Sequence, residues 1–325
     1  MPQRAARPAA AVFRPPKPWW PKPLANAFAS RRSRDLLREA DATPPARPSA
    51  KEERFANRLF LALSPRVKRV PPGAPSSHLE PYEQLEIARS EGRGRLAATW
   101  FPATGTPRGA VLLVHPWIQW GQRYFHRRGR IGALRAAGYH VLTFDLGGFG
   151  GSSKTAPAFY DRDVGDALAA LRARAGDLPV HLWGVSCGGY WAHALLSREA
   201  VCGAMFEDVS RHLIEWSGRM APWGWPCYTF FRKCLRTAYR FMDLRRHAPC
   251  LRAQAVAYVS GASDRGVLAA ETRELARLAG GRYFVVPEAD HLESIKKATE
   301  DVLAFALESF ELAERGATGT VAAEA

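Results

Sequence analysis

The stretch Pro179–Leu196 has the sequence PVHLWGVSCGGYWAHALL. Its first part, Val180–Trp183, is an apolar run of strand length, and its last part, Tyr190–Leu196, has the composition of a helix. The glycine-rich segment Gly184–Gly189 between them predicts a sharp turn, because glycine lacks the Cβ that would collide across a tight bend. A side chain at the centre of such a strand, turn and helix stands clear of both elements. The stretch therefore predicts Ser186 as an exposed nucleophile.

Strand-like and helical patterns alternate through residues 81–315. Short apolar runs separated by helical patterns are typical of a mainly parallel sheet covered by helices on both faces. The predicted strands are Ala110–Val114, Tyr139–Phe144, Val180–Trp183, Val201–Phe206, Ala255–Ser260 and Arg282–Val286, and the predicted helices are Tyr124–Ala137, Asp161–Ala175, Cys187–Ser197 and Leu292–Glu314. Two alternating runs, Glu83–Arg89 and Arg95–Phe101, joined by Glu91–Gly94, predict an antiparallel hairpin at one edge. The predicted fold class is α/β.

The ends of the chain differ in composition from residues 81–315, which we predict to be the main domain. Residues 1–80 hold 16 Lys and Arg against 6 Asp and Glu, and 14 of the 24 prolines. Such a segment forms little regular hydrogen-bonded structure, so we predict a largely disordered leader with short helices at Ser33–Ala40 and Lys51–Leu63. Residues 316–325 are predicted to be a disordered tail.

The distribution of charge along the chain indicates which classes of binding partner the sequence favours. Most of the net charge of +15 lies in the leader, so the rest of the chain gives no sign of a nucleic-acid partner. Beside the interpretation of residues 1–50 as a disordered tail, Trp19 and Trp20 with the surrounding Arg and Lys leave open contact with a membrane surface or an acidic partner, and an organelle transit peptide is a further alternative.

Other features bear on the compartment. The sequence has no membrane-spanning apolar run and no secretory signal pattern. Five cysteines without a C-x-x-C pair suit a reducing compartment better than a disulfide framework or a zinc site. We expect a cytoplasmic protein, with peripheral membrane association left open.

The segment Ser210–Cys250 interrupts the alternation of strands and helices. It is too long for a simple crossover between two strands, and it is rich in aromatic residues. Two interpretations stay open: a packed helical excursion, or a helical lid over a substrate pocket, since insertions at sheet ends often carry binding loops. As part of a lid, Trp216, Trp223 and Phe230 are candidate contacts for an apolar portion of a substrate.

A serine nucleophile needs a base and a carboxylate that orients the base. In open α/β sheets such groups follow the carboxyl ends of the strands. His291 follows the last predicted strand and is the candidate base. Asp264 follows the strand Ala255–Val259 and is the candidate acid. Asp208, just after Phe206, remains the alternative acid, because a neighbouring strand could bring it to the same imidazole.

An oxyanion also needs N–H donors. The expected donors are the N–H of Cys187, directly after the candidate nucleophile, and that of Trp117, in the loop after the first parallel strand. Pro116 has no N–H to donate, and His115 is expected to shape the loop through a backbone partner. The run Asp145–Ser152 lacks the Gly-Lys-Ser/Thr ending of a phosphate-binding loop and is predicted to be a structural turn. No metal or cofactor is expected.

These motifs together resemble those of the α/β-hydrolase superfamily, in particular serine hydrolases with a small helical lid. The residues that carry the resemblance are Gly184-Val185-Ser186-Cys187-Gly188, His115-Pro116-Trp117, Gly138-Tyr139 with Asp145–Ser152, Gly261-x-x-Asp264 and Asp290-His291. The resemblance covers about residues 81–315, and Pro116 departs from it by standing where the family usually has glycine. It implies cleavage of an ester, thioester or amide through an acyl-enzyme.

A second hypothesis from another class remains. A non-catalytic protein with the same fold could be tethered by its basic leader to a membrane or an acidic partner. The three filled triad positions favour the enzyme, and a serine at the turn argues against the related branches that use an aspartate nucleophile. Esterases, thioesterases, lipases and peptidases share this machinery, so the sequence does not distinguish among them.

Overall fold

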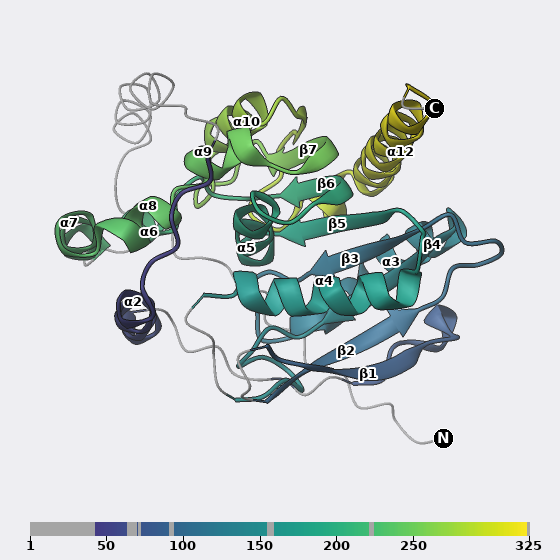
Figure 1. The fold of residues 1–325 in the computed structure, drawn as a ribbon, viewed down its shortest axis with the longest axis horizontal. Helices are drawn as coiled ribbons and strands as arrows, with labels where there is room; N and C mark the ends of the chain where they lie inside the picture. The colour runs from purple at the N-terminus through teal and green to yellow at the C-terminus, as the bar shows by residue number, and fades with distance from the viewer. Residues whose placement is uncertain are drawn as a thin grey trace, which may run out of the picture.

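A single eight-stranded sheet runs through the structure, a computed structural model that describes residues 43–63, 70, 73–90, 94–154, 159–220 and 224–323 (Figure 1). The strands lie in the order β1-β2-β4-β3-β5-β6-β7-β8. They are β1 Glu83–Ala88, β2 Arg95–Phe101, β3 Gly109–Val114, β4 Tyr139–Phe144, β5 Val180–Val185, β6 Val201–Glu207, β7 Ala253–Gly261 and β8 Arg282–Val286. Only the pairs β1–β2 and β2–β4 are antiparallel among these strands. The α/β fold class and the hairpin at one edge are confirmed.

The apolar composition of the central strands follows from burial on both faces. All residues of β3 are buried, and its side chains alternate between two cores. Ala110, Leu112 and Val114 belong to one core, and Val111 and Leu113 to the other. β1, at the edge, is mostly exposed.

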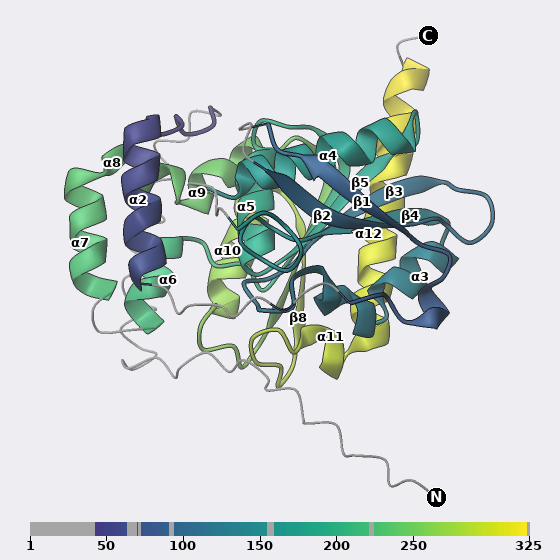
Figure 2. The same ribbon diagram turned by 90° about the horizontal axis from the view of Figure 1, so that it is seen from below.

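Helices cover both faces of the sheet (Figures 1 and 2). On one face, α4 Asp161–Ala175 and α5 Cys187–Leu196 pack against β3 and β5. On the other, α3 Arg130–Ala136 packs against β4, and α12 Thr299–Ala323 packs against β6 and β7. The remaining elements around the sheet are η1 Ser77–Leu79, η2 Gly121–Arg127, α10 Ala269–Leu278 and α11 Ser294–Lys297. This arrangement leaves the carboxyl ends of the parallel strands together at one edge.

The segment between β6 and β7 forms a group of short helices, here named the helical cap. It comprises α6 Leu213–Met220, α7 Gly224–Cys234, α8 Arg236–Phe241, α9 Leu244–His247 and the 3₁₀ turn η3 Ala248–Cys250. Helix α2 Ala50–Leu63 lies beside α7 and α8 (Figure 2). The carboxylate of Glu52 accepts a hydrogen bond of 3.0 Å from the N–H of Ala238, and this bond attaches α2 to the cap.

Two predicted helices are broken in the structure. The predicted helix Tyr124–Ala137 is instead η2 followed by α3, because Gly129 between them takes a φ of 71°, which interrupts a right-handed helix. The predicted helix Leu292–Glu314 is divided into α11 and α12. The first of these, α11, begins at Ser294 and not at Leu292, because the N–H of Leu292 donates to Asp208 and Leu292 has a φ of 61°.

Two further differences concern helices that extend or were missed. Residues 316–325 are predicted to be a disordered tail, but α12 continues to Ala323. No proline interrupts this stretch, and adding residues to a formed helix is easier than nucleating one. The helix α10 is not predicted, although its buried residues Thr272, Leu275 and Ala276 have helical spacing. The predicted helix Ser33–Ala40 and most of the predicted hairpin loop, residues 91–93, lie outside the described residues.

Two further features of the described residues are the character of the helices and the state of the cysteines. None of the helices within the described residues combines the length and the apolar character needed to cross a membrane. The cysteines whose side chains the structure describes are free; they are Cys187, Cys202, Cys234 and Cys250.

We predict that Gly184→Ala lowers the free energy of unfolding by about 1–3 kcal/mol, the usual cost of overpacking. The Cβ would collide with the Cα of Gly189 where β5 meets α5, and neither backbone can move aside easily. The control is Gly132→Ala in α3, where a Cβ meets nothing within 4 Å. This substitution should raise the free energy of unfolding by about 0.5–1 kcal/mol, because alanine is more stable than glycine inside a helix. Urea denaturation measures both. Equal stability of the two variants would contradict a close contact between strand and helix.

Candidate active site

Ser186 occupies a sharp turn between β5 and α5. Its φ of 50° and ψ of −120° are strained for a residue with a Cβ. The surrounding structure maintains this conformation: the Ser186 N–H donates to the carbonyl of Glu207 at 2.7 Å, and the Ser186 carbonyl accepts from the N–H of Tyr190 at 2.8 Å. A Cβ at Gly188 would collide with the carbonyl oxygen of His115, so only glycine permits this approach. The turn therefore holds the hydroxyl at the carboxyl end of the sheet.

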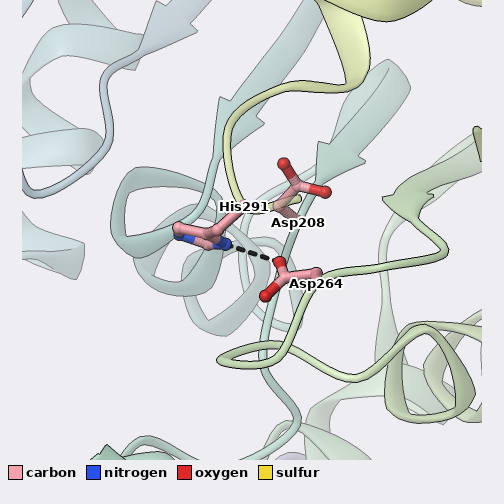
Figure 3. Close-up of side chains that lie close together, drawn as sticks. All are labelled: Asp208, Asp264 and His291. Carbon is pink, nitrogen blue, oxygen red and sulfur yellow. Dashed lines mark hydrogen bonds and ion pairs between the residues drawn. The ribbon is translucent and has the colours of Figure 1, made fainter. Parts of the chain in front are cut away.

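The structure brings Ser186, His291 and Asp264 together in one row. The Oγ of Ser186 lies 2.9 Å from Nε2 of His291, and Nδ1 of His291 lies 2.7 Å from Oδ2 of Asp264. The three residues follow β5, β8 and β7, so three segments far apart in the sequence meet at one edge. Figure 3 shows the bond between the His291 ring and the Asp264 carboxylate.

Asp264 is held in a fixed orientation. Its second oxygen, Oδ1, accepts hydrogen bonds from the N–H groups of Gly266 and Val267, both at 2.8 Å. The side chain of Asp264 is fully buried, and that of His291 is 9% exposed. Because Oδ1 is held by these two N–H groups, Asp264 presents only Oδ2 to the imidazole. The bond from Oδ2 to Nδ1 therefore fixes the orientation of the His291 ring.

Asp208 lies close to the same ring but performs another task (Figure 3). Its Oδ2 accepts from the N–H of Leu292 at 2.9 Å, and its Oδ1 accepts from the N–H of Gly261 at 3.2 Å. These bonds tie the loop that carries His291 to the end of β7. Of the two acids left open by the sequence, Asp264 is therefore the one that bonds to Nδ1, whereas Asp208 holds the backbone of the loop.

The charges around the ring shift two pKa values. Burial lowers the pKa of His291, but the Asp264 carboxylate outweighs this effect, with smaller contributions from Asp208 and Asp290, so the pKa is raised from 6.5 to about 9. Burial raises the pKa of Asp208 to about 7, and nearby Asp264 adds to the increase while the His291 charge opposes it. The site therefore favours a charged imidazole that is hydrogen-bonded to Asp264.

The same three side chains, Asp208, Asp264 and His291, place oxygen and nitrogen atoms within 4.8 Å of one another, as a metal site would. Both ring nitrogens of His291, however, already make hydrogen bonds, to Ser186 and to Asp264. An ion would have to displace one of these bonds to reach a nitrogen. The arrangement fits a hydrogen-bonded row better than a metal centre.

The loop after β3 lies against the start of α5. Buried His115 shapes this loop as expected: its Nδ1 bonds to the carbonyl of Pro116 at 2.7 Å, and its Nε2 accepts from the N–H of Leu146 at 3.0 Å. Burial lowers the pKa of His115, which suits a neutral ring that donates at one nitrogen and accepts at the other. Cys187 is the first residue of α5, where an N–H has no intrahelical acceptor. Trp117 follows in the loop, so both predicted oxyanion donors lie on adjoining segments.

The glycine-rich run Asp145–Ser152 is a structural turn, as predicted. The carboxylate of Asp145 accepts from the N–H groups of Gln122 at 2.8 Å and Gly151 at 2.9 Å. Gly148 and Gly150 take positive φ values of 87° and 41°. Within the run, the N–H of Gly151 donates to Asp145 and that of Gly147 to Asp163, so internal carboxylates already occupy amides that a phosphate would need.

An aromatic cluster that the sequence analysis did not identify lies beside the turn. The ring of Trp117 is 5.1 Å from that of Phe149 and 5.6 Å from that of Tyr160, and Tyr160 is 6.3 Å from Trp191 of α5. Burial raises the pKa of the Cys187 thiol to about 12, and Trp191 opposes this shift. The signal for this cluster was weak because its members are far apart in the sequence.

The three candidate substrate contacts have different positions. Trp216 is half-buried in α6 and packs against the core. Trp223 lies outside the described residues. Phe230 is 36% exposed, and its ring lies 5.8 Å from that of Phe55 on the outer side of the cap. The structure therefore does not bring Phe230 to Ser186, because composition alone cannot show which side of α7 faces inward.

A buried ion pair beneath the site was also missed. Arg130 and Glu207 are fully buried and bonded to each other, and Trp183 Nε1 donates to the same Glu207 carboxylate at 3.3 Å. Glu207 precedes Asp208, and its carbonyl accepts from the N–H of Ser186. The pair therefore supports both β6 and the turn. Its members are about 77 residues apart, so no local pattern indicated it.

We predict that Asp264→Asn lowers the pKa of His291 more than Asp208→Asn does. The Asp264 carboxylate bonds directly to the ring, whereas Asp208 bonds to the backbone of its loop. Ring-proton NMR titration measures the pKa, and His291→Gln assigns the signal among the nine histidines. A larger drop in Asp208→Asn would make Asp208 the acid of the row.

Comparisons with known proteins agree with this geometry. Residues 109–211 match the family model of the alpha/beta hydrolase fold, and no curated protein matches the sequence. An esterase of Pyrococcus furiosus has a similar fold, with a TM-score of 0.60 and 18% identity, over 77% of this chain and 99% of that chain.

Two further solved structures share the fold. A hydrolase from Pseudomonas aeruginosa has a TM-score of 0.53 and 20% identity, over 70% of this chain and 97% of that chain. A carboxyl esterase from Bacillus coagulans has a TM-score of 0.53 and 16% identity, over 70% of this chain and 97% of that chain. With the matched family model over residues 109–211 and the eight-stranded sheet, these likenesses show that the chain has the α/β-hydrolase fold.

Proposed function

We propose that the protein is a serine hydrolase that cleaves an ester, thioester or amide through an acyl-enzyme. The observation that carries this proposal is the continuous row from the Ser186 hydroxyl, through the His291 ring, to the Asp264 carboxylate, with distances of 2.9 and 2.7 Å. A serine hydroxyl is a weak nucleophile unless a base accepts its proton, and the row supplies that base in position.

The reaction follows from the positions of these groups. Ser186 Oγ attacks the carbonyl carbon while His291 Nε2 accepts its proton. The N–H groups of Cys187 and Trp117 stabilise the oxyanion of the tetrahedral intermediate. The bond to the leaving group breaks, and the leaving group takes the proton from His291. Water then attacks the acyl-enzyme with His291 again as base, and this releases the acid and restores the Ser186 hydroxyl.

The two acids have separate tasks in this mechanism. Asp264 holds the ring with its Nδ1 proton inward, which leaves Nε2 free to accept from Ser186, and it stabilises the imidazolium that forms. Asp208 is a positioning residue, since it acts on the loop through the N–H of Leu292. Asp208 bonds to the backbone of the loop and Asp264 bonds to the ring, and together they hold Nε2 of His291 within reach of the Ser186 hydroxyl.

We propose carboxylic esters as the first substrate class to test. Two of the similar folds, from Pyrococcus furiosus and Bacillus coagulans, are named as esterases. A chain-length series of p-nitrophenyl esters, with acyl-thioesters and anilides as the other classes, identifies the preferred bond and acyl length.

We predict that Ser186→Ala lowers kcat for the best ester of this series by about 10⁶-fold, the loss seen when a triad nucleophile is removed. The control is Ser90→Ala, an exposed serine after β1. Circular dichroism checks that both variants keep the fold. Hydrolysis that persists at the wild-type rate in Ser186→Ala would contradict the proposal.

We also predict that kcat/KM rises with pH along a limb well above the ordinary histidine range. The base must be neutral, and because the pKa of His291 is raised to about 9, the ring loses its proton only as the pH approaches that value. Asp264→Asn should move the limb to lower pH and lower the maximal rate by about 10⁴-fold. A wild-type limb at or below pH 6.5 would contradict the raised pKa.

A further inference from the structure

We propose that an outer face formed by helices α2 and α7 binds the surface of an anionic lipid bilayer. This face, here named the α2–α7 face, consists of Lys51, Arg54, Phe55 and Arg58 of α2 with Phe230 and Lys233 of α7. All six residues are exposed. The proposal does not depend on the proposed hydrolysis.

The spacing of these residues places them on one side of each helix. In α2, the exposed residues occupy positions 51, 54, 55 and 58, which is the i, i+3, i+4, i+7 pattern of a single helical stripe. The buried residues Glu53 and Ala56 lie on the other side. In α7, Phe230 and Lys233 are three positions apart and so share a side.

Phe55 of α2 and Phe230 of α7 contact each other where the exposed sides of the two helices meet. Helices α2 and α7 lie side by side (Figure 2). The ring of Phe55 on α2 lies 5.8 Å from that of Phe230 on α7, so the two helices present one aromatic pair. Phe55 is 48% exposed and Phe230 is 36% exposed. Two large apolar rings that contact each other and still face solvent form an apolar centre of the kind that marks an interaction site.

The carboxylates of α2 point away from this face. Glu53 is buried and paired with Arg47 at 2.7 Å and Arg162 at 3.1 Å. Glu52 bonds to the N–H of Ala238. Glu52 and Glu53 therefore bond to groups of the protein itself, whereas the basic side chains of the face are exposed to solvent. Within the part of the chain that the structure describes, no ion pair joins the four cations of the face to an acid.

A bilayer fits both components of this surface. Cations on the polar side of an interfacial helix are attracted to anionic headgroups, and exposed phenylalanines enter the boundary between headgroups and acyl chains. Helix α8 adds Arg236 and Arg240, both exposed, next to the face. The sequence before α2 is also basic and contains Trp19 and Trp20, for which contact with a membrane or an acidic partner is one interpretation; residues 1–42 lie outside the described residues.

Co-sedimentation of the full chain with vesicles of phosphatidylcholine, with and without phosphatidylglycerol, tests the proposal. The double variant Arg54→Glu/Arg58→Glu should bind the anionic vesicles at least about tenfold more weakly than wild type, since each basic residue near an anionic surface contributes about fivefold. The matched control is Arg127→Glu/Arg277→Glu, which makes the same charge change at exposed residues outside the face and should lose much less. Every protein keeps the same basic leader, so the comparison isolates the face.

A second variant separates a bilayer from a soluble polyanion. Phe55→Ser/Phe230→Ser keeps all cations, and it should weaken binding to anionic vesicles about tenfold or more while binding to heparin stays at the wild-type level. Circular dichroism checks its helices. Equal losses of vesicle binding in Arg54→Glu/Arg58→Glu and Arg127→Glu/Arg277→Glu would overturn the proposal. Vesicle binding that survives in Phe55→Ser/Phe230→Ser would also overturn it, because it would indicate a polyanion site.

Discussion

The position of the His291 ring is the constraint on which the site depends, and two carboxylates maintain it by different means. Asp264 bonds to the ring nitrogen, and its second oxygen is fixed by two backbone N–H groups. Asp208 bonds to the N–H of Leu292 and to the end of β7. One acid orients the ring and the other holds its loop, so Nε2 stays within 2.9 Å of the Ser186 hydroxyl. Beneath them, the buried pair of Arg130 and Glu207 supports the strand that carries Asp208.

Much of this arrangement could be predicted because parallel strands impose it. Ser186, Asp264 and His291 each directly follow a recognisable strand, and the carboxyl ends of such strands meet at one edge. The choice between Asp208 and Asp264 could not be predicted in this way, since both follow suitable strands. It depends on which backbone N–H groups each carboxylate reaches, and those bonds exist only after the loops have folded. For the same reason, the sequence suggested Phe230 as a substrate contact, whereas packing in the cap turns it outward.

Local patterns predicted the sheet better than the helices. The apolar runs of β3 and β4 reflect the burial of these strands, so their predicted bounds are close to the observed ones. Helix ends depend on contacts that no short window contains: the positive φ of Gly129 divides one predicted helix, and the bond from Asp208 delays another. The net charge illustrates the same limit. Composition shows an excess of cations, but only the structure shows that the acids of α2 face inward and leave its outer side basic.

Mapping the site of covalent labelling by a fluorophosphonate tests the central claim most directly. The reagent phosphonylates an activated serine and releases fluoride, and it requires the same hydroxyl and base as the proposed acyl transfer. Mass spectrometry of the peptides should place a single adduct on Ser186, and the adduct should disappear in His291→Gln. Labelling at another serine, or a Ser186 that reacts equally well without the imidazole, would contradict the account.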